Sequence, residues 1–104
     1  MLEPQFKMYA KPTCPFCEKA KDLILNNLKL SVSIEDVTDR PTLRNELIGE
    51  TGIKTVPIIY LGDKLIGGCS DLEESILNGR MEVFLLKEEI RLLKQEITSL
   101  RTSI

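Results

Sequence analysis

The sequence of 104 residues contains no histidine and only three cysteines, Cys14, Cys17 and Cys69. A structural zinc ion takes four ligands, and neither histidine nor a second cysteine pair is present to complete such a set, so we expect no metal site. The sequence has no apolar run close to the ~18 residues that a membrane span needs. Its N-terminus lacks the basic and apolar pattern of a secretion signal. We therefore expect a soluble cytoplasmic protein.

An excess of charge of either sign is also missing. The sequence has 14 basic and 16 acidic side chains, and its formal net charge is −2. Because a strong basic excess is what attracts polyanions, we predict that neither nucleic acid nor a membrane surface is a partner. Internal repeats and low-complexity tracts are absent as well, and the length suits one domain with a modest core.

The most informative stretch is Lys-Pro-Thr-Cys-Pro-Phe-Cys at residues 11–17. The alternation in residues 5–10 predicts a strand before it, and apolar residues at helical spacing predict a helix after it. Cys14 should therefore lie near the N-cap of that helix. Unpaired backbone N–H groups and the helix dipole favour an anion at this place. Lys11 adds a positive charge nearby, so we expect Cys14 to be a reactive thiolate.

Cys17 lies one helical turn further on, so we expect it to be more buried and able to close a disulfide with Cys14. This pair predicts thiol–disulfide exchange, in which Cys14 attacks and Cys17 resolves. A purely structural disulfide is a weaker interpretation, because so short a loop restrains little unfolded-chain entropy. A compartment that keeps thiols reduced suits the redox role. For Cys69 the simplest interpretation is a small, half-buried residue at a strand end, and a redox role or glutathionylation stays open.

The rest of the chain divides into alternating strands and helices. Pro41 favours a helix start, Gly62 with Asp63 predicts a hairpin turn, and Ser70 or Asp71 is expected to cap a later helix. The first two strands flank a helix, so we expect them to be parallel. The predicted elements are a strand at 6–10, a helix at 15–27, a strand at 30–34, a helix from 41 to 49–52, strands at 54–61 and 64–66, a helix from 70 to 78, and a helix from 80 to the end.

In this order of elements the chain resembles a dithiol glutaredoxin over about residues 5–85. The matching blocks are Lys11 with the Cys-Pro-Phe-Cys motif, then residues 55–57 (Thr-Val-Pro), then residues 67–71 (Gly-Gly-Cys-Ser-Asp). Phe16 stands where the family more often has tyrosine. Thioredoxin itself is less similar, because its Gly-Pro pair and its tryptophan are missing here. The resemblance implies an α/β, thioredoxin-like fold with a four-stranded mixed sheet flanked by helices.

The resemblance also implies glutathione as co-substrate. The reaction would be reduction of protein disulfides and of protein–glutathione mixed disulfides at the two motif cysteines, with no general base. The backbone of Val56, before a cis Pro57, would pair with glutathione as an added strand. The γ-glutamyl end would lie at Ser70 and Asp71, where a helix begins. Asp71 also has a plainer interpretation, as a helix cap without a ligand.

The glycyl carboxylate of glutathione would be held by Lys11 and Arg44, and the plainer interpretation of both is surface charge. An alternative function is a glutathione-ligated iron–sulfur carrier, in which each of two protomers supplies Cys14 and a glutathione. In the family, a proline after the first cysteine disfavours that role, and Pro15 is present. A redoxin reduced by a flavoprotein reductase is a third hypothesis, which Lys11, Arg44 and Asp71 disfavour.

The C-terminal helix continues beyond the point where the family usually ends, so we predict a glutaredoxin domain at 1–86 and a helical extension at 87–104. Its apolar residues follow each other in steps of three and four, as in a coiled coil. The a positions are Val83, Ile90, Ile97 and Ile104, and the d positions are Leu86, Leu93 and Leu100. The g positions are Glu82, Glu89 and Glu96, and the e positions are Lys87, Lys94 and Arg101. We predict a parallel homodimer; the alternative is that this face extends the domain core.

Overall fold

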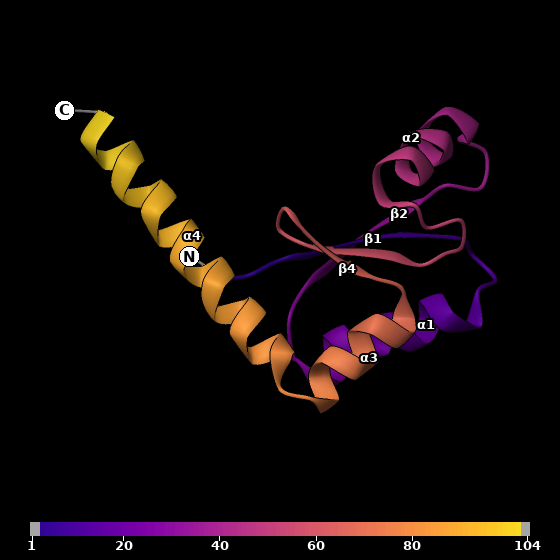
Figure 1. The fold of residues 1–104 in the computed structure, drawn as a ribbon, viewed down its shortest axis with the longest axis horizontal. Helices are drawn as coiled ribbons and strands as arrows, with labels where there is room; N and C mark the ends of the chain where they lie inside the picture. The colour runs from indigo at the N-terminus through magenta and orange to yellow at the C-terminus, as the bar shows by residue number, and fades with distance from the viewer. Residues whose placement is uncertain (1–2, 103–104) are drawn as a thin grey trace.

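The computed structural model describes residues 3–102, and its elements follow the predicted order of strands and helices. Helix α2 covers one face of the sheet, and α1 and α3 cover the other (Figure 1). In chain order the elements are β1 (Phe6–Ala10), α1 (Pro15–Asp22), the π-helical turn η1 (Leu23–Asn27), β2 (Val32–Asp36), α2 (Pro41–Thr51), β3 (Ile58–Leu61), β4 (Lys64–Gly67), α3 (Cys69–Leu77) and α4 (Arg80–Thr102).

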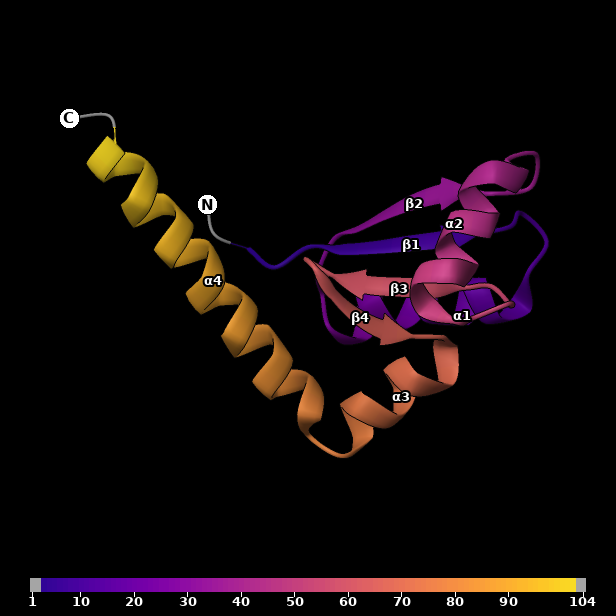
Figure 2. The same ribbon diagram turned by 45° about the horizontal axis from the view of Figure 1, so that its top comes forward.

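The sheet has the strand order β2-β1-β3-β4. Strands β1 and β2 are parallel and pair Phe6 with Val32, as expected for strands joined through a helix. Strand β3 is antiparallel to both β1 and β4, so the sheet is mixed (Figure 2). The thioredoxin-like arrangement that the sequence predicted is therefore confirmed.

The main core lies between the sheet and the helices α1 and α3. Alternation along β1 directs Phe6 and Met8 into it, where both are buried, together with Ile24 and Leu72. Burying such a side chain stabilises the fold by roughly 1.5–3 kcal/mol. The first turn of α4 adds Met81 to the same cluster. This core holds the N-terminal ends of α1 and α3 at one end of the domain.

Some boundaries differ from those expected. Strand β2 begins at Val32, not at residue 30, because Leu30 donates its N–H to the carbonyl of Ile24 and so closes the preceding helical segment. Strand β3 begins at Ile58, not at residue 54, because the strand that it pairs with, β1, ends at Ala10.

The start of α3 is also corrected. The helix begins at Cys69 with Gly68 as its N-cap, because the Gly68 carbonyl accepts the first helical hydrogen bond, from Leu72. The predicted caps, Ser70 and Asp71, therefore lie inside the first turn. Asp71 still caps the helix, since its Oδ2 accepts the Gly68 N–H at 2.9 Å.

Helix α4 leaves the domain after α3 and runs past the tip of the β3–β4 hairpin (Figure 2). No helix in residues 3–102 is both long and apolar enough to cross a membrane. The heptad positions Leu100, Arg101 and Ile104 lie outside the residues whose side chains the structure describes.

Candidate functional site

Cys14 is the N-cap of α1, as the sequence predicted. Pro15, the first helical residue, has no N–H to offer, and the Cys17 N–H donates to the Cys14 sulfur at 3.2 Å. The backbone at Cys14 is extended, and the thiol is partly exposed. Its Sγ lies 3.8 Å from the carbonyl oxygen of Val56, on the loop before β3. The helix N-terminus thus directs a backbone donor at a sulfur that solvent can reach.

Cys17 is in a different environment, although it belongs to the same motif. Only 4% of its surface is exposed. Burial, with a smaller contribution from its hydrogen bond to Cys14, raises the pKa of the Cys17 thiol to about 12. Burial also raises the pKa of Cys69, which is at the start of α3. Of the three cysteines, Cys14 is therefore the one open to attack a substrate.

These differences predict selective alkylation. Because burial raises the pKa of Cys17 to about 12, its thiolate is scarce at pH 7. We expect iodoacetamide at pH 7 to label Cys14 about a hundredfold or more faster than Cys17 or Cys69, as measured by peptide mass spectrometry. In guanidinium chloride all three should react alike. Equal labelling of Cys14 and Cys17 in the folded protein would contradict the assignment.

A pocket of about 400 Å³ lies beside the motif. Its walls come from three separate parts of the chain, namely the motif, the loop before β3 and the start of α3. The peptide bond between Val56 and Pro57 is cis, as the resemblance implied. Residues that line the pocket include Phe16, Val56, Pro57, Gly68, Ser70 and Asp71. Four predicted glutathione-binding residues, at 56, 57, 70 and 71, therefore share one pocket.

The α3 end of this pocket combines free donors with a carboxylate. The backbone N–H groups of the first turn have no partner within the helix, and Asp71 uses Oδ2 for the cap. Gly67 has φ +121°, and a Cβ there would lie 2.4 Å from Asp71 Oδ2, so only glycine allows this approach. This end can therefore bind a carboxylate through N–H groups and an ammonium group through Asp71.

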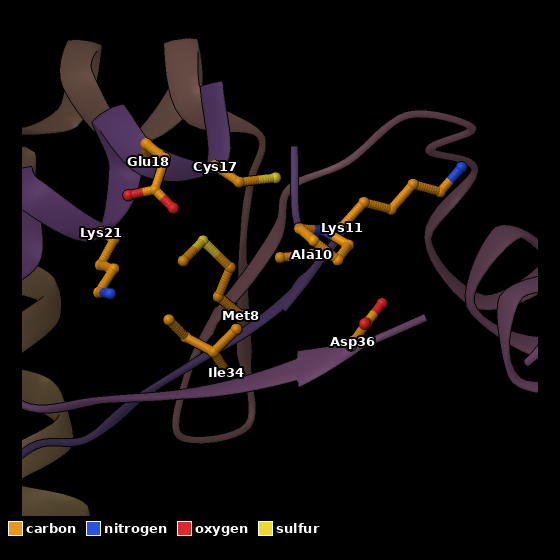
Figure 3. Close-up of a pocket in the computed structure, with 9 residues that line it drawn as sticks. Met8, Ala10, Lys11, Cys17, Glu18, Lys21, Ile34 and Asp36 are labelled. Carbon is orange, nitrogen blue, oxygen red and sulfur yellow. The ribbon is translucent and has the colours of Figure 1, made fainter. Parts of the chain in front are cut away.

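Lys11 lies apart from that pocket. It borders a second hollow of about 280 Å³, whose lining also includes Met8, Cys17 and Ile34 (Figure 3). The Lys11 side chain extends away from Met8 and Ile34, and it is exposed (Figure 3). Lys11 is therefore next to the motif in sequence but is not among the residues that line the pocket beside Phe16.

Arg44 is on α2 and also lies outside the pocket. Its Nη2 donates to the carbonyl oxygen of Lys54 at 2.7 Å, and Lys54 directly precedes the lining residue Thr55. Neither of the two predicted carboxylate ligands, Lys11 and Arg44, thus lines the pocket. Sequence reasoning left out Phe16, a pocket residue with 64% of its surface exposed. The signal that could have identified it as a site residue is its position between Cys14 and Cys17.

No group of three or more cysteine, aspartate or glutamate side chains that could hold a metal ion occurs in residues 3–102.

A thiol at a helix N-terminus, facing the loop before β3 across a thioredoxin-like sheet, defines a thiol–disulfide oxidoreductase of the thioredoxin fold. The glutaredoxin family model matches residues 6–66, more than half of the sequence, and the chain belongs to the glutaredoxin family.

Relatives agree with this assignment. Glutaredoxin-1 of Sus scrofa is 35% identical over 92 residues, which cover 84% of this chain and 85% of the relative. Glutaredoxin 3 of Escherichia coli is 34% identical over 79 residues, covering 76% of this chain and 94% of the relative. The crystal structure of a buckwheat glutaredoxin–glutathione complex superposes with a TM-score of 0.73, covers 82% of this chain and 79% of its own, and at 23% identity shows the shared fold. The protein is a glutaredoxin-type oxidoreductase.

Proposed function

We propose that this glutaredoxin reduces protein–glutathione mixed disulfides and protein disulfides through Cys14 and Cys17, with glutathione as co-substrate. The observation that carries the proposal is the position of the Cys14 sulfur. It accepts the Cys17 N–H at 3.2 Å and lies within 3.8 Å of the Val56 carbonyl, which borders the pocket. A substrate sulfur placed in that pocket would meet the one accessible thiol of the motif.

The proposed reaction is a sequence of thiol–disulfide exchanges. The Cys14 thiolate attacks the glutathione sulfur of a mixed disulfide; the substrate S–S bond breaks, a Cys14–glutathione disulfide forms, and the target leaves as a thiolate. A second glutathione thiolate then attacks the bound glutathione sulfur, which yields glutathione disulfide and the free Cys14 thiolate. Alternatively Cys17 loses its proton and attacks Cys14, which releases glutathione and leaves a Cys14–Cys17 disulfide for glutathione to reduce. No general base acts on Cys14.

Glutathione binding is assigned to the pocket beside the motif. We propose that the backbone of Val56, next to Pro57, pairs with the extended tripeptide. Its γ-glutamyl carboxylate would bind the N–H groups at Ser70, and its ammonium group would bind Asp71. The location of all four residues around one pocket supports this placement. Lys11 and Arg44, which do not line this pocket, are proposed to bind the glycyl carboxylate.

Replacing Asp71 with asparagine tests the ammonium contact. The Asp71→Asn variant keeps an oxygen that can accept the Gly68 N–H, so the α3 cap and the melting temperature should be nearly unchanged. It loses the charge that binds the ammonium group, so KM for a small glutathione mixed disulfide should rise about tenfold. Turnover with glutathione, glutathione reductase and NADPH measures both kcat and KM.

A matched control is Glu74→Gln, which removes one negative charge from the same helix at an exposed position one turn further along. Its KM should stay within about twofold of the unmodified protein, because surface charges contribute little. An Asp71→Asn variant with unchanged KM would leave Asp71 as a cap only.

The alternative, a glutathione-ligated iron–sulfur carrier, is separated by anaerobic purification. A brown protein with charge-transfer absorption bands would support the carrier, and a colourless protein that turns over the mixed disulfide would support the oxidoreductase. In the carrier, the Cys14 thiol would be the cluster ligand. Pro15, as first residue of α1, disfavours the carrier role in this family.

We further propose a domain division at residues 1–86 and 87–104, within the continuous helix α4. The partners proposed are glutathionylated or disulfide-bonded proteins and, through α4, a second copy of this chain. A reducing compartment suits a Cys-x-x-Cys redox site, and we propose the cytoplasm.

A further inference from the structure

Helix α4 has two faces with different surroundings, and one of them packs on its own domain. Met81 is buried in the main core. Phe84, one turn after Met81, contacts the β3–β4 hairpin, because Lys64 Nζ lies 4.4 Å from the centre of its ring. Glu88, one turn further along, is only 8% exposed. Arg91 donates to both Glu88 oxygens, at 2.6 and 2.8 Å. This domain-facing side corresponds to positions b, c and f of the heptad pattern.

The opposite side of α4 is apolar and uncovered. Its residues recur in steps of three and four, and each has about half of its surface exposed: Val83 48%, Leu86 59%, Ile90 51%, Leu93 47% and Ile97 49%. We call these residues the α4 stripe. The alternative, that this side merely extends the domain core, is wrong for these positions, because each of them is exposed. A continuous exposed stripe of this kind usually marks an interaction surface.

Charged side chains border the α4 stripe on both sides in a regular pattern. Acidic residues lie at g (Glu82, Glu89, Glu96) and basic residues at e (Lys87, Lys94). Within residues 3–99 none of these five side chains forms an ion pair, whereas Glu88 and Arg91 on the domain-facing side do. The charges beside the stripe are therefore free to pair with another molecule.

We infer that the α4 stripe binds the same stripe of a second copy of this chain, in a parallel two-stranded coiled coil. Branched Val or Ile at a with Leu at d favours two parallel strands. In a parallel pair each g glutamate meets a basic e residue of the partner's next heptad, as Glu89 with Lys94. An antiparallel pair would set g against g and e against e, so that glutamate would face glutamate and lysine would face lysine. The charges at positions e and g therefore favour the parallel arrangement over the antiparallel one.

The dimer leaves both catalytic sites open. Positions b, c and f lie on the outside of a two-stranded coil, and these are the positions that hold the domain. The N-termini of α1 and α3 are at the end of the domain away from α4 (Figure 2). The two Cys14 thiols therefore face away from the coil, and each protomer can turn over independently.

Sedimentation equilibrium of the full chain tests the dimer. At about 50 µM we expect mainly the dimer mass, because association depends on concentration. An Ile90→Lys variant puts a charge in the middle of the α4 stripe and should weaken association about a hundredfold or more. The control Leu77→Lys makes the same change at an apolar residue that is 81% exposed on α3, outside the stripe, and should stay dimeric. A monomeric full chain, or a dimeric Ile90→Lys variant, would overturn the inference.

The parallel orientation has its own test, because Glu89→Lys should weaken association in a parallel dimer but not in an antiparallel one. In a parallel dimer Glu89→Lys sets lysine against Lys94 of the partner subunit and should weaken association about tenfold, and adding Lys94→Glu should restore it. In an antiparallel dimer Glu89→Lys would face another g position and not Lys94 of the partner subunit, so association should stay unchanged or become stronger. That result would overturn the parallel coil.

Failure of the dimer proposal can be distinguished from failure of the proposed redox function. The Ile90→Lys monomer should keep the mixed-disulfide turnover of the full chain, because the stripe and the Cys14 site share no residue. Loss of dimerisation with retained turnover, and the reverse, are thus distinguishable outcomes.

Discussion

Replacing Cys14 with serine is expected to abolish turnover of glutathione mixed disulfides and of protein disulfides alike, by about a thousandfold or more. A serine hydroxyl does not ionise near neutral pH and cannot form the enzyme–glutathione disulfide. The loss should not come from unfolding. Serine is among the best N-cap residues and can accept the Cys17 N–H in place of the sulfur.

The measurement is the glutathione-reductase-coupled assay, with thermal unfolding of the same sample as control. The melting temperature of Cys14→Ser should match that of the unmodified protein within a few degrees. Residual turnover above about one per cent, in a folded variant free of glutathione adducts, would mean that another thiol can serve as nucleophile. Cys69, which lines the pocket, would then be the first residue to examine.

The second large effect should separate the two activities. In Cys17→Ser the accessible thiol remains, so turnover of a small glutathione mixed disulfide should stay within about threefold of the unmodified protein. Reduction of a protein disulfide needs the second thiol to release the target, and that activity should fall about a hundredfold or more.

Mass spectrometry of trapped intermediates checks the same point. Cys17→Ser should accumulate a Cys14–glutathione adduct or a mixed disulfide with the target, whereas the unmodified protein should resolve to the Cys14–Cys17 disulfide. If Cys17→Ser lost both activities to the same degree, the roles assigned to the two cysteines would be wrong. A loss of stability is the competing explanation, because Cys17 is buried, and unfolding curves of both proteins exclude or confirm it.

Much of the fold follows from local patterns in the sequence. The alternation of Phe6 and Met8 predicted a strand, and both side chains are buried as that strand requires. The helix start at Pro41 was also predicted correctly, because proline is well suited to the first turn. Cys14 as N-cap and Cys17 as a buried residue follow from the same local geometry.

What the sequence could not predict depends on contacts between distant segments. The start of β2 depends on how the helix before it closes on Ile24, and the end of β1 limits β3. Ser70 and Asp71 are better N-caps than glycine by residue type, yet the helix begins one residue earlier, and Asp71 caps it from inside the first turn by accepting the Gly68 N–H. For Lys11 and Arg44 the family resemblance indicated the residue but not the direction of a long side chain.

The contact between α4 and the hairpin tip sets a practical limit for fragment design. Glu88 lies so close to Gly62 that a Cβ there would be 2.1 Å from the Glu88 Oε2 atom, and Arg91 lies 3.7 Å from Asp63. A fragment that ends before Glu88 would remove the cover from the β3–β4 turn together with the stripe residues Ile90, Leu93 and Ile97. A fragment of the catalytic domain for crystallisation or labelling should therefore run through Leu92, beyond the proposed division at residue 86, with the exposed stripe positions that remain changed to polar residues.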